Sequence, residues 1–264
     1  MRINRQAESK KTPLTGLTTN GVHYIGQKTM GTPGQIGENL QNVLRRIAEA
    51  ALRAERRPEE VQLVAVSKTR SPEEIAELIH AGQRLFGENR VQELAQKLDA
   101  LEPETESFGL EWHFVGHLQT NKARILAGRV RLIHGVDSLH LAEALQRAAE
   151  QRDCTVDCLL EINVSGESSK FGIPPAEVEG VVAALRPFDR VHCLGLMTMA
   201  PWDEDPEAAR PVFRGLREIR DRTRSIGHSH VDLRHLSMGM THDFEIAIEE
   251  GATLVRIGTA LFEQ

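Results

Sequence analysis

The chain has 264 residues, 40% of them hydrophobic and 27% charged, which suits one large hydrophobic core or two smaller ones. A formal net charge of −6 argues against bulk electrostatic attraction to nucleic acid or to an anionic membrane. Because no apolar run approaches the roughly 18 residues needed to cross a bilayer, the composition predicts a soluble globular protein.

Residues 1–35 are rich in Thr, Gly and basic side chains, poor in acidic ones, and lack the apolar core of a secretory signal. We interpret this segment as a disordered leader; a transit-type segment and an appended extension are the alternatives. Cys154, Cys158 and Cys193 fit neither a disulfide framework nor a C-x-x-C site, which favours the reducing cytoplasm and a packing role for these side chains.

Beyond residue 35, short β-rich runs alternate with amphipathic stretches. An opening helix is expected over 36–56, and strands over 61–67, 84–88, 111–116, 131–136, 156–164, 191–197, 233–237 and 253–258. Helical patterns fall at 72–81, 89–101, 119–128, 138–151, 175–186, within 206–226 and at 241–250. Ser71 is expected to cap the helix that Pro72 begins, and Pro211 to kink or restart the one within 206–226. Eight strands, each but the last followed by a helix, predict an α/β fold: a single (β/α)8 TIM barrel over 36–264.

Barrels of this class place their ligand sites at the carboxyl ends of the strands, so the residues that follow each strand are candidate site residues. They are Ser67-Lys68, Glu88-Asn89, residues 113–116, Asp137, Asn163, Met197, residues 237–241 and residues 256–259. Ser237, Gly239, Gly258 and Thr259 follow the last two strands, where hydroxyls and closely approaching backbone suit a phosphate. The alternative, that these glycines only serve the geometry of the turns, stays open.

Lys68 is the only lysine that ends an apolar strand run. In one interpretation its side chain reaches to solvent or pairs with Glu88. In the other, burial at the barrel mouth desolvates the amine, lowers its pKa and frees it to attack an aldehyde. Combined with a phosphate site across the rim, the second interpretation predicts pyridoxal 5′-phosphate (PLP) as the ligand.

Seven segments, in this order, resemble the YggS/PROSC family of PLP-binding homeostasis proteins over residues 36–262. They are AVSKT (65–69), FGENRVQE (86–93), WHFVGHLQTNK (112–122), EINVSGESSKFG (161–172), GLMTMAP (195–201), LSMGM (236–240) and VRIGTALF (255–262). The resemblance implies a fold-type III barrel similar to the N-terminal domain of alanine racemase. Thr241 and the final Phe-Glu-Gln depart from the family pattern, and neither departure involves the lysine.

The resemblance also assigns roles at the site. It implies that PLP is held as an internal aldimine on Lys68 and that Ser237, Gly258 and Thr259 hold its phosphate. It places Arg256 beside the pyridine nitrogen, which would stay unprotonated and make the ring a weak electron sink; an ion pair with a helix carboxylate is the alternative for this arginine. Asn89 and Asn163 match family positions near the cofactor.

The expected function is that of a monomeric, cytoplasmic PLP carrier or regulator that supplies or buffers the cofactor, with apo-PLP enzymes as candidate recipients and neither nucleic acid nor membrane as a partner. A two-base racemase needs a second proton-transfer group opposite the lysine, which in alanine racemases is a tyrosine. The only tyrosine here, Tyr24, lies in the leader. The alternative is a PLP-dependent, racemase-like enzyme in which His113 or a cysteine is the second base.

Metal and nucleotide sites are the remaining classes. His113 and His117 are four residues apart, and His228, His230, His235 and His242 are close in sequence. On a strand, a turn and a loop these spacings do not bring imidazoles together, so we expect no zinc site. Neither G-x-G-x-x-G nor G-x-x-x-x-G-K-[ST] occurs, and no nucleotide site is expected.

Overall fold

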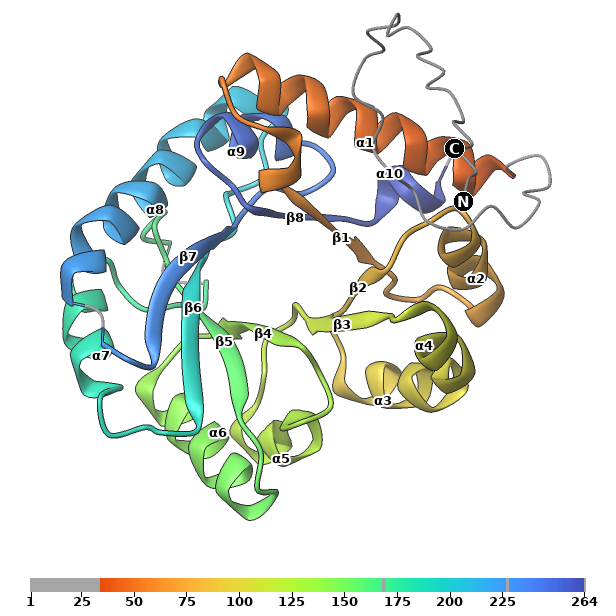
Figure 1. Cartoon of the computed structure of the whole chain (residues 1–264). Helices are drawn as coiled ribbons and strands as arrows, with labels where there is room; N and C mark the ends of the chain where they lie inside the picture. Colours follow the sequence, from red (N-terminus) through yellow and green to blue (C-terminus); the bar gives the residue numbers. More distant parts are fainter. Residues whose placement is uncertain (1–33, 168–169, 227, 264) are drawn as a thin grey trace, which may run out of the picture. The chain divides into compact units, whose positions relative to one another are not determined.

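Eight parallel strands form a closed barrel in the computed structural model, which describes residues 34–167, 170–226 and 228–263. Each strand pairs with the next along the chain, and the last pairs with the first. The strands are β1 (Gln62–Val66), β2 (Leu85–Glu88), β3 (Glu111–Phe114), β4 (Leu132–Val136), β5 (Val156–Glu161), β6 (Val191–Met197), β7 (Val231–Ser237) and β8 (Leu254–Ile257). Helices surround them as an outer ring (Figure 1). The predicted (β/α)8 barrel is confirmed.

The helices follow the predicted order with three differences. They are α1 (Gln35–Arg53), α2 (Pro72–His80), α3 (Val91–Ala100), α4 (Glu102–Phe108), α5 (Ala123–Leu126), α6 (Leu139–Gln151), α7 (Val178–Ala184), α8 (Arg210–Thr223), α9 (Phe244–Glu249) and α10 (Thr259–Phe262). The helix α4 was not predicted; Pro103 lies in its first turn, where proline is tolerated. The expected helix at 119–128 is a 3-10 turn, Thr120–Lys122, followed by the single turn of α5. The last strand, expected to have no helix after it, is followed by α10.

The opening helix begins at Gln35, the last residue of the predicted leader, and residues 1–33 of that leader lie outside the described residues. Leu40, Val43 and Ile47 lie on one face of α1 and are buried, as their helical spacing predicts. Figure 1 shows α1 on the outside of the barrel, beside α9 and α10. The Arg46 guanidinium donates two hydrogen bonds of 3.0 Å to the Glu245 carboxylate and so ties α1 to α9.

Caps and prolines define the helix starts as expected. The Ser71 hydroxyl accepts from the Glu74 amide (3.3 Å), and the Glu74 carboxylate accepts from the Ser71 amide (2.9 Å), which completes a capping box at α2. Pro211 lies in the first turn of α8, directly after the 3-10 helix Pro206–Ala209, so it restarts the helix. The three cysteines are free, and Cys158 and Cys193 are buried on neighbouring strands, as predicted for packing residues.

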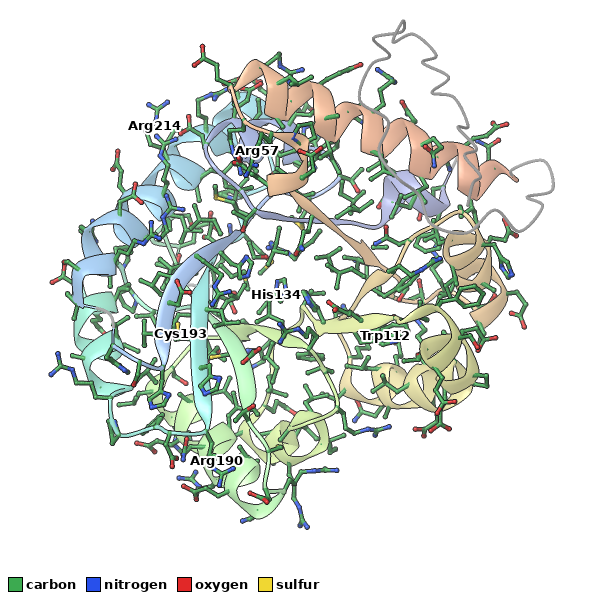
Figure 2. The ribbon with its side chains drawn as sticks, viewed as in Figure 1. Arg57, Trp112, His134, Arg190, Cys193 and Arg214 are labelled. Atoms are coloured by element: carbon green, nitrogen blue, oxygen red, sulfur yellow. The ribbon has the colours of Figure 1, made fainter. Side chains whose placement is uncertain are left out.

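The barrel interior changes from apolar to polar along the strands. Its apolar layer consists of Val64, Leu132, Leu159, Met197 and Leu254. Because residues two apart on a strand face the same side, His134, Glu161 and Arg256 follow in the next layer toward the carboxyl ends. Figure 2 shows His134 inside the barrel. The fold thus gathers buried polar side chains beneath the rim where the sequence places the site.

None of the described helices combines the length and apolar character that crossing a bilayer requires. Within the same residues, no three His, Cys, Asp or Glu side chains are placed to hold a metal ion. The histidines four apart are used separately: His113 bonds to His134 inside the barrel, whereas His117 contacts Asp137 at 3.1 Å and stacks on Phe171.

Candidate functional site

Lys68 lies in the turn directly after β1, at the carboxyl-end rim. Lys68 is four residues after Val64, whose side chain faces the barrel interior, and residues an even number of positions apart on a strand face the same side. Its side chain is exposed, and its amine makes no hydrogen bond or ion pair with the described part of the chain. The expected burial of this amine is therefore wrong for the protein alone, because β1 ends at Val66 and the turn carries the lysine out to solvent. The amine is accessible to a ligand that approaches the rim.

The backbone next to Lys68 is strained. Thr69 has a φ of 63°, in the left-handed region that β-branched residues rarely adopt. Its hydroxyl donates to the Lys68 carbonyl (2.6 Å) and its amide donates to the Glu93 carboxylate (3.3 Å), which together hold this conformation. Strain of this kind is concentrated at functional sites.

A buried ion pair fixes the chain just before Lys68. The Lys97 amine, on α3, donates to the Ser67 carbonyl (2.6 Å) and to the Glu88 carboxylate, and the Ser67 hydroxyl donates to the same carboxylate oxygen (2.8 Å). The three side chains are buried. The alternative pairing of Lys68 with Glu88 is therefore wrong: Lys97 takes that carboxylate and leaves the Lys68 amine without a partner there.

Two polar atoms beside this ion pair are buried without a hydrogen-bond partner among the described residues: Asn89 Oδ1 and Glu88 Oε2. A buried polar atom without a hydrogen bond destabilises the folded state unless a water or a ligand bonds to it. Asn89 follows β2, next to β1 in the barrel, so the incomplete acceptor belongs to the same part of the rim as Lys68. Asn89 was selected from the sequence, and the structure places its unpaired Oδ1 at this rim; its contact with a cofactor stays a prediction.

The turn after β8 approaches the end of β1. A Cβ on Gly258 would lie 3.1 Å from the Val66 carbonyl oxygen, so only a residue without a side chain fits easily there. Thr259 is the next residue and is exposed. The pairing of β1 with β8 thus brings the predicted Gly258-Thr259 phosphate segment to the same rim as Lys68.

Gly239 serves close packing. Its φ is 92°, and a Cβ would lie 2.6 Å from the Ala247 Cβ and 2.9 Å from the Phe244 Cα. Close contact with α9 therefore requires glycine at this position, which agrees with the alternative that the glycine serves the geometry of the turn. A contact between Gly239 and phosphate stays a prediction.

Ser237 and Arg256 are joined inside the barrel. Arg256 Nη1 donates to Ser237 Oγ (2.5 Å), and Nη2 donates to the Thr198 carbonyl (3.1 Å). Ser237 is fully buried and is engaged beneath the rim, so its contact with a phosphate stays a prediction. Arg256 forms no ion pair with the described residues. The alternative interpretation, an ion pair with a carboxylate on a helix, is therefore wrong.

The Arg256 guanidinium stays a cation in spite of its burial. Desolvation lowers its pKa to about 10, while the Glu161 and Asp243 carboxylates act in the opposite direction. A guanidinium has five N–H donors and no acceptor. Because only two of its hydrogen bonds go to the described chain, donors remain for a ligand acceptor.

Sequence reasoning did not single out Glu161, an acid at the end of β5. Burial, and next the Asp137 carboxylate, raise the pKa of Glu161 to about 7, with Arg256 acting against the shift. Its Oε2 lies 3.2 Å from where a Cβ of Gly135 would be, so the glycine on β4 makes room for the carboxyl group. The available signal was its parity with buried Leu159 on the strand.

Asn163 is occupied by its own loop. Its side-chain nitrogen Nδ2 donates to the Glu167 carbonyl (2.9 Å), and its Oδ1 accepts from the backbone N–H of Gly166 (3.0 Å). These bonds shape the turn after β5, so the structure uses Asn163 for loop conformation, and its proximity to a cofactor stays a prediction.

The barrel fits the class defined by the family model described as alanine racemase, N-terminal domain, which matches residues 39–264. The chain is 47% identical over 225 residues to the pyridoxal phosphate homeostasis protein of Aquifex aeolicus, covering 85% of this chain and 96% of that protein. It is 43% identical over 233 residues to the protein of that name from Escherichia coli strain K12, covering 86% and 95%. The chain belongs to the family of pyridoxal phosphate homeostasis proteins, which confirms the resemblance seen in the seven segments.

Solved structures agree with this assignment. PipY of Synechococcus elongatus, solved with PLP bound, is 36% identical with a TM-score of 0.74, and the match covers 86% of this chain and 100% of that one. D-threonine aldolase from Filomicrobium marinum, at 19% identity and a TM-score of 0.61 over 84% of this chain and 60% of that one, shares the fold.

Proposed function

We propose that this chain binds PLP covalently through Lys68 and acts in PLP homeostasis as a carrier or regulator in the cytoplasm. The observation that carries the proposal is the exposed, unpaired Lys68 amine, which lies at the carboxyl-end rim beside the Gly258 turn and the incomplete Asn89 acceptor. The PLP-bound PipY structure and the names of the relatives support the choice of ligand.

The residues present fit PLP. When bound, PLP supplies an aldehyde that bonds to an amine and a conjugated ring that withdraws electrons. Lys68 would provide the amine, and Gly258 with Thr259 would hold the phosphate through backbone and hydroxyl donors. Arg256 would face the ring nitrogen; because a guanidinium only donates hydrogen bonds, that nitrogen would remain an acceptor without a proton.

A carrier role is favoured over catalysis by the positions of the candidate second bases. The His113 side chain is buried inside the barrel and bonded to His134 (2.9 Å), and Cys158 and Cys193 are fully buried in the core. None of these three groups is exposed at the rim to exchange a proton with a substrate. Tyr24 lies outside the described residues. We infer a monomer that passes PLP to apo-PLP enzymes.

The test of the site is absorbance. Titrating the purified protein with PLP should produce a visible absorption band, because conjugation through an imine extends the chromophore. Lys68→Ala should abolish the band with the circular dichroism spectrum unchanged. Lys122→Ala, which removes a lysine from the loop after β3, is the matched control and should keep the band. Persistence of the band in Lys68→Ala would refute the assignment.

The test of the carrier role is proton exchange. The PLP-loaded protein is incubated with L-alanine in deuterated water, and exchange at the α-carbon is followed by NMR. A carrier should exchange this proton no faster than free PLP at the same concentration. Exchange well above that rate would establish the racemase-like alternative.

A further inference from the structure

A continuous chain of hydrogen bonds crosses the barrel beneath the rim. His113 Nδ1 lies 2.9 Å from His134 Nε2, and His134 Nδ1 lies 2.8 Å from Ser237 Oγ. Ser237 Oγ accepts from Arg256, which also donates to the Thr198 carbonyl. All five residues are buried, and they come from β3, β4, β7, β8 and the segment after β6. Figure 2 shows His134, the middle of this chain, inside the barrel.

The directions of these bonds follow from the requirement that each buried hydrogen in the chain has an acceptor. Arginine can only donate, so Ser237 Oγ accepts from Arg256 and its own hydrogen is free. His134 Nδ1 is the acceptor within reach of that hydrogen. A neutral His134 then carries its proton on Nε2 and donates it to His113 Nδ1. The guanidinium charge therefore sets the tautomers of two histidines in succession.

The surroundings keep both imidazoles neutral. Burial lowers the pKa of His113 to about 3, with Arg131 and His235 acting in the same direction. Burial also lowers the pKa of His134 well below its ordinary value, and the Arg256 guanidinium acts in the same direction. A proton added to His134 would remove the only acceptor of the Ser237 hydroxyl seen among the described residues.

We propose that His134, oriented by His113, is a positioning residue that fixes the Ser237 hydroxyl and through it the Arg256 guanidinium, which would face the ring nitrogen of PLP. The inference rests on the proposed function, because it assigns residues that support the PLP site. Without the His134 acceptor, the Ser237 hydrogen is buried and unpaired, and it can turn toward the guanidinium and displace it. The environment of the ring nitrogen, and so the spectrum of bound PLP, would change.

The first test needs no cofactor. Long-range 15N–1H NMR of the imidazoles in the PLP-free protein at neutral pH should show His134 protonated on Nε2 and bare on Nδ1, and His113 likewise. A proton on Nδ1 of His134, or a doubly protonated ring, would overturn the directed chain, whatever the protein binds.

The second test compares variants. His134→Leu removes the acceptor, His134→Asn keeps an oxygen near the position of Nδ1, and Leu132→Ala loses apolar contacts from the same strand without loss of a hydrogen bond. His134→Leu should weaken PLP binding about tenfold, the effect of one buried hydrogen bond, and shift the absorption maximum and its pH titration. His134→Asn should restore most of both, and Leu132→Ala should leave the spectrum unchanged.

The outcomes distinguish failure of the positioning role of His134 from failure of the proposed PLP binding. An unchanged spectrum and affinity in His134→Leu, or an equal spectral shift in Leu132→Ala, would overturn the positioning role. If His134→Leu does not fold, the test uses His134→Asn. A wild-type spectrum of PLP bound to His134→Asn supports the positioning role. The Arg256→Leu variant gives the spectrum of PLP without the arginine contact, and an equal shift in His134→Asn contradicts the role. Failure of the wild-type protein to form any visible band would refute the proposed function, while the NMR result would stand.

Discussion

Replacement of Lys97 by methionine tests the buried ion pair that holds the turn of Lys68. Methionine keeps much of the length and volume of the lysine stem but removes the amine. The Glu88 carboxylate then retains only the Ser67 hydroxyl (2.8 Å), because its Oε2 already lacks a partner among the described residues. The Ser67 carbonyl also loses the donor that lies 2.6 Å away.

The expected loss is large because the charge left behind is buried. Removal of one partner of a buried ion pair costs about 3–5 kcal/mol, whereas an exposed pair is worth at most about 1 kcal/mol. The exposed fractions of the two side chains, 10% for Lys97 and 0% for Glu88, place this pair in the first group. For a domain of this size, a loss of about 3 kcal/mol lowers the melting temperature by roughly 6–12 °C.

Urea unfolding followed by circular dichroism measures the free energy, and the double variant Glu88→Gln with Lys97→Met is the control. Because the double variant leaves no buried charge unpaired, it should recover at least about half of the loss. A loss below about 0.5 kcal/mol in Lys97→Met, within the range of ordinary surface substitutions, would refute the reasoning. So would a double variant that is as unstable as the sum of the two single variants.

Three further changes have defined outcomes in the same unfolding assay. Since Glu161 binds its proton more tightly in the folded state (pKa raised from 4.5 to about 7), stability should fall as pH rises through that window. Glu161→Gln should remove this pH dependence of the free energy of unfolding. The variant should be more stable than the wild type by about 3 kcal/mol near pH 8 and equally stable near pH 4; a difference that does not change with pH would contradict this. Gly239→Ala should cost about 2–3 kcal/mol, because its Cβ meets Ala247 at 2.6 Å and its φ is positive; a neutral effect would contradict the packing role. Ser71→Ala should cost about 1 kcal/mol through loss of the Glu74 cap, and an unchanged midpoint would contradict it.

The barrel could be predicted because its elements repeat local signals. Apolar runs of strand length alternate with helical spacing, and the helix cap at Ser71 and the strand Val191–Met197 are found at the predicted positions. The helix α4 was missed because its first turn contains Pro103, and no residue in Glu102–Phe108 is buried to give an apolar period. Short elements without a buried face carry no such signal.

The sequence predicted which end of the barrel carries the candidate residues but not their contacts. The predicted strand ends placed Lys68, Asn89 and Gly258 at one rim, because the residues that follow parallel strands meet at the same end of a barrel. The chain that links His134 to Ser237 joins residues 103 positions apart, and no local pattern specifies which hydroxyl meets which ring. The sequence also left open whether Lys68 is buried or reaches to solvent, because its exposure depends on the turn geometry at 67–70 and not on the apolar run before it.

Reductive trapping tests the central claim most directly. The protein is loaded with PLP, reduced with borohydride so that any imine becomes a stable amine, digested and analysed by tandem mass spectrometry. Covalent binding at the rim predicts a phosphopyridoxyl group on Lys68, with Lys97 and Lys122 unmodified. Modification of either control lysine in place of Lys68, or no modified peptide at all, would contradict it.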